Sequence, residues 1–99
     1  MTEFIEVDPA ELHLPPSRPK GADPGKLARQ IARYGKSLVG MPRLQLIRGK
    51  EGHLRINDGV TRATRAAKRQ PGVLVQAEVI QDLPTLNVTQ MPKVREVLP

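Results

Sequence analysis

Apolar and polar residues alternate in several short stretches of the chain, with the period of two that is typical of half-buried strands. This pattern predicts strands at residues 4–7, 43–46 and 53–57. Ala10 to Leu14 continues or flanks the first strand, and the turn at residues 48–52 joins the other two into a hairpin. Val73 to Ile80 is the most apolar stretch and predicts a central strand that is covered on both faces.

One segment has the helical period and carries both start and stop signals. Asp23 is placed to cap this helix, Pro24 takes its first position and Gly35 follows its last turn. Its expected buried face has residues at helical spacing: Leu27, Ile31 and Tyr34. Another face carries a basic stripe at steps of three and four: Lys26, Arg29 and Arg33.

A second helix is predicted directly after the strand at residues 53–57, where the apolar period changes. Small residues mark its inner face: Ala63, Ala66 and Ala67. Arginines line up on another face, with Lys68 alongside: Arg62, Arg65 and Arg69. The change of period falls at Asn57-Asp58-Gly59, where we expect Asp58 to cap the helix and Gly59 to take a backbone conformation closed to residues with a Cβ.

These elements predict an α+β fold with a small mixed sheet of about four strands and two main helices. Residues 1–83 would form this domain and residues 84–99 a C-terminal tail. Prolines at 84, 92 and 99 interrupt the tail and leave room only for a short helix at Lys93 to Leu98. The apolar residues of the tail can cover either the body of the protein or a partner subunit.

Charge is concentrated in the middle of the chain, whose formal net charge is +6. Residues 1–16 carry four acidic residues and no Lys or Arg, whereas residues 17–72 carry 14 Lys and Arg against three acidic residues. Such a concentration favours a polyanionic partner, either a nucleic acid or a nucleotide phosphate. A solvated surface explains the charge equally well, and the two basic stripes form one patch only if the helices lie side by side.

Several classes of protein are disfavoured by what the chain lacks. It has no cysteine, and His13 and His53 are too isolated in sequence to predict a metal site. No apolar run approaches the roughly 20 residues of a membrane span, and no secretory leader is recognisable. We therefore expect a cytoplasmic protein without a membrane partner. Only Phe4 and Tyr34 are aromatic, so the core should consist of Leu, Ile, Val and Ala.

The turn before the second helix is the best candidate for a site. The first amides of a helix and its positive dipole end attract anions, and Arg62 would lie at the same point. An arginine in the first turn is unfavourable for the dipole and so calls for an anionic partner, which Asp58 can itself supply. Asp58 and Gly59 also have a purely structural interpretation, as a helix cap and a turn residue.

This turn resembles a motif of the ParB/sulfiredoxin superfamily, in which a strand, a turn of the form (D)G-x-(H/T/R)-R and a helix follow one another. The matching residues are Asp58, Gly59, Thr61, Arg62 and Ala66, and the order of the flanking elements agrees over roughly residues 4–83. Val60 and Thr61 stand where the chromosome-segregation members carry glutamate and arginine. Sulfiredoxin activity is excluded, because it needs a cysteine.

The resemblance implies a ParB-like N-terminal domain, related to plasmid or chromosome partition, that binds a nucleotide such as CTP or ATP together with Mg²⁺. It places the nucleotide and its phosphates at two segments: Asp58, Gly59, Val60, Thr61 and Arg62, and Gly40, Met41 and Pro42. The expected partners are a nucleotide or nucleic acid, and a second copy of the chain or another protein.

Three functions are consistent with these residues. The first is a nucleotide- or phosphate-binding module that acts in DNA transactions or their regulation. The second is a ParB-like nuclease or NTPase, which needs a pair of metal-binding carboxylates. Asp58 is the only carboxylate near the motif and the catalytic candidate, and Asp23 and Glu51 are distant candidates for the second carboxylate. The third is a nucleic-acid-binding domain without nucleotide chemistry, which would use the cations of both helices: Lys26, Arg29, Arg33, Arg65, Lys68 and Arg69. Two aromatic residues offer no base-stacking platform for single strands.

Overall fold

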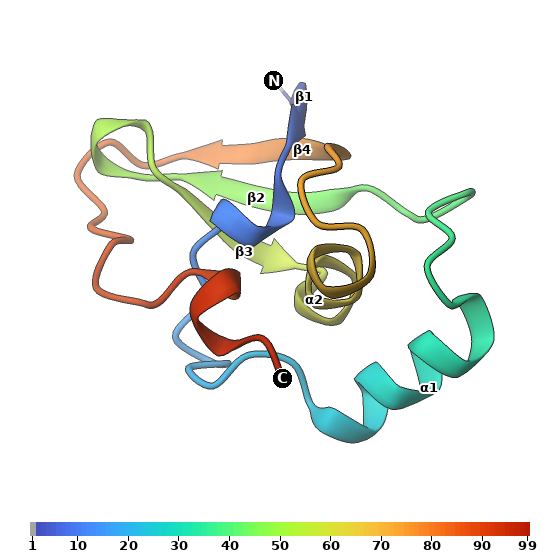
Figure 1. The fold of residues 1–99 in the computed structure, drawn as a ribbon. Coiled ribbons are helices and arrows are strands. Elements are labelled where there is room, and N and C mark those ends of the chain that lie inside the picture. The colour runs from blue at the N-terminus through green and yellow to red at the C-terminus, as the bar shows by residue number, and fades with distance from the viewer. Residues whose placement is uncertain (1) are drawn as a thin grey trace.

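The sheet and the two helices predicted from the sequence are present in the computed structural model, which describes residues 2–99. The strands are β1 (Glu3–Val7), β2 (Leu44–Arg48), β3 (Leu54–Asp58) and β4 (Val75–Asp82), and the helices are α1 (Pro24–Tyr34) and α2 (Val60–Arg69). The strands form one sheet in the order β1-β4-β2-β3 (Figure 1). Because β2 and β4 are parallel and the other pairs antiparallel, the sheet is mixed, and the expected α+β fold is confirmed.

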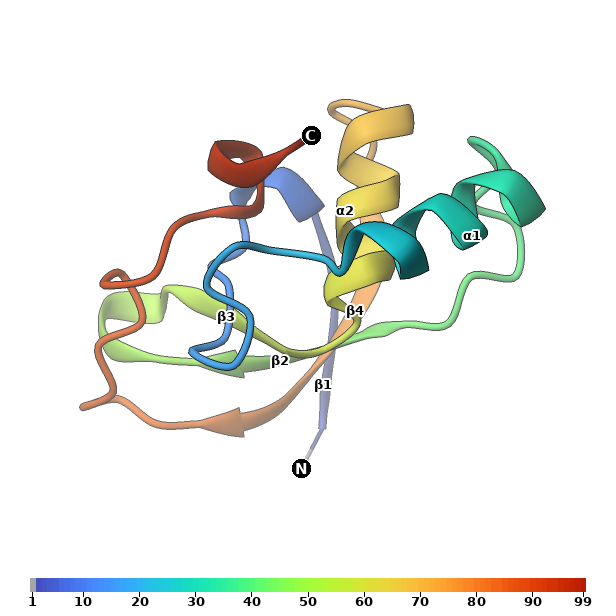
Figure 2. The ribbon, with the colours of Figure 1, turned by 90° about the horizontal axis from the view of Figure 1, so that it is seen from below.

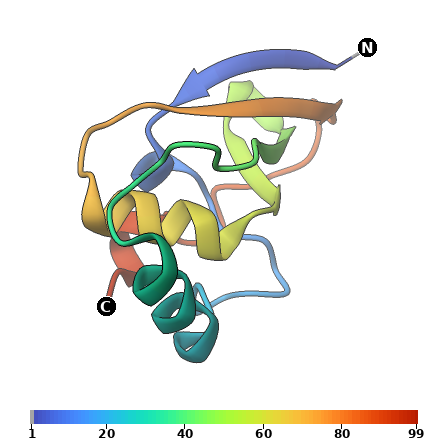
Figure 3. The same cartoon turned by 90° about the vertical axis from the view of Figure 1, so that its right-hand side faces the viewer.

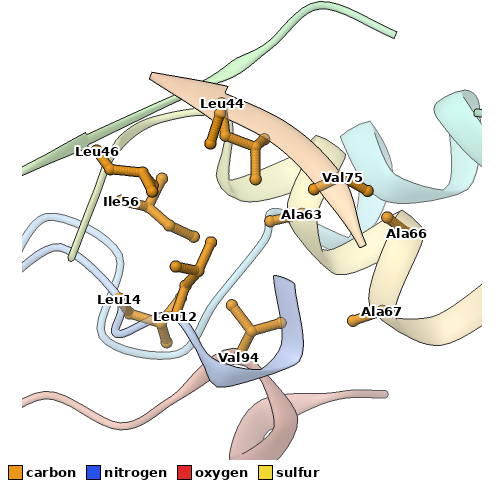
Figure 4. Packing of buried hydrophobic residues seen from close by; sticks show 11 residues of the cluster. Leu12, Leu14, Leu44, Leu46, Ile56, Ala63, Ala66, Ala67, Val75 and Val94 are labelled. Atoms are coloured by element: carbon orange, nitrogen blue, oxygen red, sulfur yellow. The ribbon is translucent and has the colours of Figure 1, made fainter. Parts of the chain in front are cut away.

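Both helices lie on one side of the sheet, with α2 next to the strands and α1 beyond it (Figures 2 and 3). The alanines of α2 belong to the buried cluster, which joins this helix to apolar residues of β2, β3 and β4 and to Leu12, Leu14 and Val94 (Figure 4). The buried cluster includes Leu44, Leu46, Ile56 and Val75, and it contains no aromatic residue. The core is therefore aliphatic, as the composition predicted.

The hairpin of β2 and β3 and the central position of β4 are also confirmed. β4 is nevertheless covered on one face only, so the prediction of two covered faces was wrong. Val75, Ala77 and Val79 are buried, whereas Ile80 is 40% exposed. No helix lies on the outer face of the sheet in the part of the chain that the structure describes (Figure 3).

Helix α1 begins and ends where the sequence predicted. The Asp23 carboxylate accepts a hydrogen bond from the Lys26 amide at 3.0 Å, and Gly35 closes the helix with a bond to the Ile31 carbonyl. The predicted buried face was partly wrong: Leu27 is buried, but Tyr34 is 47% exposed.

None of the helices within residues 2–99 is long and apolar enough to cross a membrane.

The segment after β1 is a 3-10 turn, Pro9–Glu11, and not the continued strand that the alternation of residues 10–14 allowed. Asp8 starts this turn by accepting the Ala10 amide at 3.0 Å, a short-range bond that competes with strand pairing. His13 then runs beside β3, exchanging backbone hydrogen bonds with Leu54 and Ile56.

The C-terminal segment packs on the body of the protein. Val88 and Val94 are buried, and the Val94 amide donates to the Leu12 carbonyl at 2.9 Å. The short helix expected at Lys93 to Leu98 is a 3-10 turn, Val94–Val97. Of the two places that the apolar residues of this segment could cover, the body is the one they occupy.

Candidate anion-binding site

The turn from β3 into α2 is built around Gly59. This glycine is the N-cap of α2 with φ +112°, a conformation that residues with a Cβ rarely adopt. A Cβ here would lie 2.7 Å from Cδ2 of the buried Leu44. Asp58 is the last residue of β3 and does not cap the helix, so the predicted N-cap was wrong.

No side chain caps the start of α2, in contrast to α1, where Asp23 does so. The first amides of a helix need partners other than the intrahelical carbonyls, and water or a ligand supplies them where no cap exists. Together with the positive end of the helix dipole, these amides make the start of α2 favourable for an anion.

The Arg62 side chain lies beside this helix start and is only weakly engaged by the protein. Nη2 donates to the Arg43 carbonyl at 3.3 Å and lies 3.6 Å from the Asp58 carboxylate. Nε is shielded from solvent and has no hydrogen-bond partner within the described chain. Asp58 therefore supplies part of the counter-charge, as the sequence allowed, but leaves donor capacity on the guanidinium unused.

A cavity of about 320 Å³ opens over the start of α2. Residues 57–62 line it, together with residues of the preceding loop and of α1: Pro15, Ser17, Arg18, Lys26 and Gln30. Three cations thus line it, counting Arg62, and Asp58 is the one carboxylate among its lining residues. The net charge of the lining is positive, which suits a phosphate better than a cation.

The loop at residues 40–42 meets the same cleft. A neighbouring cavity of about 190 Å³ is lined by Gly40, Met41 and Pro42 and shares Gln30 and Arg62 with the first. The structure therefore brings together the two segments that the sequence analysis assigned to nucleotide binding. The side chains that line both cavities are Gln30 and Arg62.

Arg65 does not belong to an exposed basic stripe, which corrects the sequence interpretation. It is 2% exposed and donates from Nη1 to the Ser37 carbonyl at 2.6 Å and the Gly35 carbonyl at 3.2 Å. Its guanidinium also lies 5.2 Å from the centre of the Tyr34 ring, and burial lowers the pKa of Arg65. Arg65 therefore holds the loop after α1 in place and is not available to a nucleic acid.

The remaining cations divide into two groups. Lys26, Arg29 and Arg33 of α1 line a cavity together with Thr61, next to the start of α2. Lys68 and Arg69 lie at the other end of α2, where Lys68 Nζ donates to the Pro99 carbonyl at 3.1 Å. The two stripes therefore do not merge along their length. They meet only at the cleft, which Lys26 of the α1 stripe and Arg62 of the α2 stripe both line.

Five residues that line the cleft were not among the predicted site residues: Pro15, Ser17, Arg18, Gln30 and Asn57. Gln30 follows Lys26 by one helical turn, and this spacing could have found it. Arg18 lies in an irregular loop, for which no periodic signal exists. Among residues 2–99, no group of three or more His, Asp or Glu side chains is placed to hold a metal ion.

No model of a known protein family, no curated protein and no solved structure matches the chain. The resemblance to the ParB/sulfiredoxin superfamily thus stays a prediction from the motif at residues 58–62 and the order of the elements.

Proposed function

We propose that the protein is a ParB-like module that binds the phosphate groups of a nucleotide at the start of α2, in the cytoplasm, in the service of DNA transactions. The observation that carries the proposal is the convergence of the uncapped helix start with the under-used guanidinium of Arg62 in one cationic cleft. Helix amides and arginine both donate to phosphate oxygens, and their combination is a common way to hold phosphate.

Arg18 and Lys26 support a multiply charged ligand. Both line the cleft with Arg62, and neither has an ion-pair partner within the described chain. Mg²⁺ would enter with the nucleotide, because it commonly uses phosphate oxygens and one or two carboxylates, and Asp58 is the carboxylate at hand.

A nucleic acid is the second candidate, and the stripe of α1 favours it. Lys26, Arg29 and Arg33 extend the positive charge beyond the cleft, so a phosphate backbone could follow them after one phosphate is held by Arg62. Binding of this kind would be strongly salt-dependent, whereas a single nucleotide held by helix amides and one arginine would depend less on salt.

Calorimetric titration tests the proposal with ATP, CTP, GTP and a short duplex DNA, each with and without Mg²⁺. The variant Arg62→Gln removes the charge at the cleft, and Arg69→Gln removes the same charge from the other end of α2. A charged hydrogen bond contributes about 1.5–3 kcal/mol, so we expect Arg62→Gln to weaken nucleotide binding about tenfold to a hundredfold and Arg69→Gln to leave it unchanged.

Each result has a distinct meaning. Saturable binding of a nucleotide that Arg62→Gln weakens and Arg69→Gln does not supports the phosphate site. It also justifies an assay for hydrolysis, in which Asp58→Asn tests the catalytic candidate. Binding of duplex DNA alone, with a steep salt dependence, replaces the proposal by direct DNA binding. Equal losses in the Arg62 and Arg69 variants, or no binding at all, refute the site.

A further inference from the structure

The two edges of the sheet differ. The edge strand β3 is flanked by His13, which exchanges backbone hydrogen bonds with it. The other edge strand, β1, pairs with β4 and with no other segment of the described chain, and it lies at the outside of the sheet (Figure 3). An edge strand of this kind presents a row of free amides and carbonyls that can pair with another strand.

The outer face of β1 carries side chains that the protein leaves without full partners. Phe4, the only phenylalanine of the chain, is 63% exposed there. The Arg43 guanidinium lies 4.8 Å from the centre of its ring, and Glu6 lies on the same face two residues further on. Glu6 is exposed and forms no ion pair with any residue that the structure describes.

We propose that β1 pairs with β1 of a second copy of the chain, antiparallel and with Ile5 opposite Ile5. In this register Phe4 stands opposite Glu6 of the second copy, with Cβ atoms about 4.5–5.5 Å apart. Since Arg43 lies over Phe4, each Glu6 carboxylate arrives beside the Arg43 of the other copy. The two phenylalanines are diagonal neighbours across the axis, within reach of each other.

Charge and pairing select this register over its neighbours. All five residues of β1 are paired when Ile5 lies on the axis, because Glu3 then faces Val7. A shift that places Glu6 on the axis sets two like charges opposite each other, which is destabilising. A shift that places Phe4 on the axis leaves Val7 unpaired and moves both Glu6 side chains away from Arg43.

The proposed dimer would have a continuous eight-stranded sheet with the helices of both copies on the same side. Five residues per strand make a small contact, so we expect a reversible dimer of the weak class, with an area below about 1,200 Å². The residues that line the anion cleft come from the loop before α1, from α1 and from residues 57–62, and none comes from β1, so the dimer leaves the cleft open. The dimer and the proposed function can therefore fail independently.

Sedimentation velocity at protein concentrations up to about 1 mM measures the monomer–dimer equilibrium. Charge reversal tests the proposed contact between Glu6 of one copy and Arg43 of the other. Glu6→Arg should weaken dimerisation about tenfold, because two attractions become two repulsions. Arg43→Glu should do the same, and the double variant Glu6→Arg/Arg43→Glu should restore the wild-type value. Glu96→Arg, an equal change of charge at an exposed residue far along the chain, is the matched control.

Oxidative cross-linking tests the register. The chain contains no cysteine, so Ile5→Cys introduces one thiol per chain. In the proposed register the two thiols of the dimer lie directly opposite each other and can form a disulfide. We expect a covalent dimer from Ile5→Cys and none from Ile80→Cys on the neighbouring strand. A wild-type chain that stays monomeric throughout the concentration range, or a double charge variant that is weaker than both single variants, overturns the proposal.

Discussion

Substituting Gly59 by alanine should lower the free energy of unfolding more than the same change at a glycine of positive φ where the added Cβ meets no other atom. Two separate terms add up at this residue. A side chain at φ +112° costs about 1–2 kcal/mol in the left-handed region. The new Cβ would also lie 2.7 Å from Leu44 Cδ2 and 3.0 Å from Arg62 Nη2. Overpacking of this kind costs about 1–3 kcal/mol, so we expect a total loss of about 2–5 kcal/mol.

Gly40→Ala is the matched control, because Gly40 has φ +72° and nothing within 4 Å of the added Cβ. Gly40→Ala therefore has the cost of a side chain at positive φ but not the cost of overpacking. Both substitutions lower the conformational entropy of the unfolded chain by the same amount, so this effect cancels in the comparison. Urea denaturation gives the two free energies of unfolding. In a chain of 99 residues, the melting temperature should fall by about 4–8 °C for each kcal/mol.

A loss of stability in Gly59→Ala no larger than that in Gly40→Ala would refute the packing term. The packing term has its own test in the background Leu44→Ala, which removes the atom that the new Cβ would meet. There the added cost of Gly59→Ala should shrink toward that of Gly40→Ala, and simple additivity of the two substitutions would contradict the assigned contact.

Three further predictions concern the packing and the polar contacts that stabilise the fold. Val94→Ala should destabilise the protein by about 2 kcal/mol in urea denaturation, because Val94 is fully buried, while the 92% exposed Val39 should tolerate alanine within about 0.5 kcal/mol. Arg65→Met should cost about 1–3 kcal/mol, because two carbonyls lose their donor, and should speed amide hydrogen exchange in residues 35–42 while exchange in β4 is unaffected. The hydrogen bond from Lys93 lowers the pKa of Glu11 below 4.5. The stabilisation that this pair gives the folded state is therefore present above pH 4.5 and is lost as the pH falls through the lowered pKa. Glu11→Gln should flatten the acid limb of the profile of unfolding free energy against pH, and an unchanged acid limb would contradict the assigned pair.

The sequence predicted the elements of the fold because their periods are clean. The alternation in β2 and β3, and the capped helix between Asp23 and Gly35, are local signals that need no knowledge of the tertiary structure. The exposure of Tyr34 was not predictable in this way. Its position on the face of Leu27 indicates burial, but α1 lies beyond α2, and the last turn of the helix reaches past the body (Figure 2).

Arg62 and Arg65 show where sequence reasoning about the site ends. They are three residues apart on one helix and belong to one predicted basic stripe, yet Arg62 lines the cleft at the helix start and Arg65 is buried. The difference comes from the carbonyls of Gly35 and Ser37 and from the Tyr34 ring, which are about thirty positions away in the chain. Burial of an arginine depends on such distant acceptors, and no local pattern encodes them.

The missing cap of α2 has a structural cause that is independent of any ligand. The usual capping residues Ser, Thr, Asp and Asn all carry a Cβ. The contact with Leu44 and the φ of +112° both disfavour a Cβ at position 59. Packing of the turn on the core thus explains the glycine, and the glycine explains why the helix start lacks a side-chain cap. What points to an anion is therefore the set of cations around that start, Arg18, Lys26 and Arg62, because core packing gives no reason for three of them to line one cleft. It follows that Arg18→Gln and Lys26→Gln should weaken phosphate binding without lowering the free energy of unfolding, whereas Gly59→Ala should lower both.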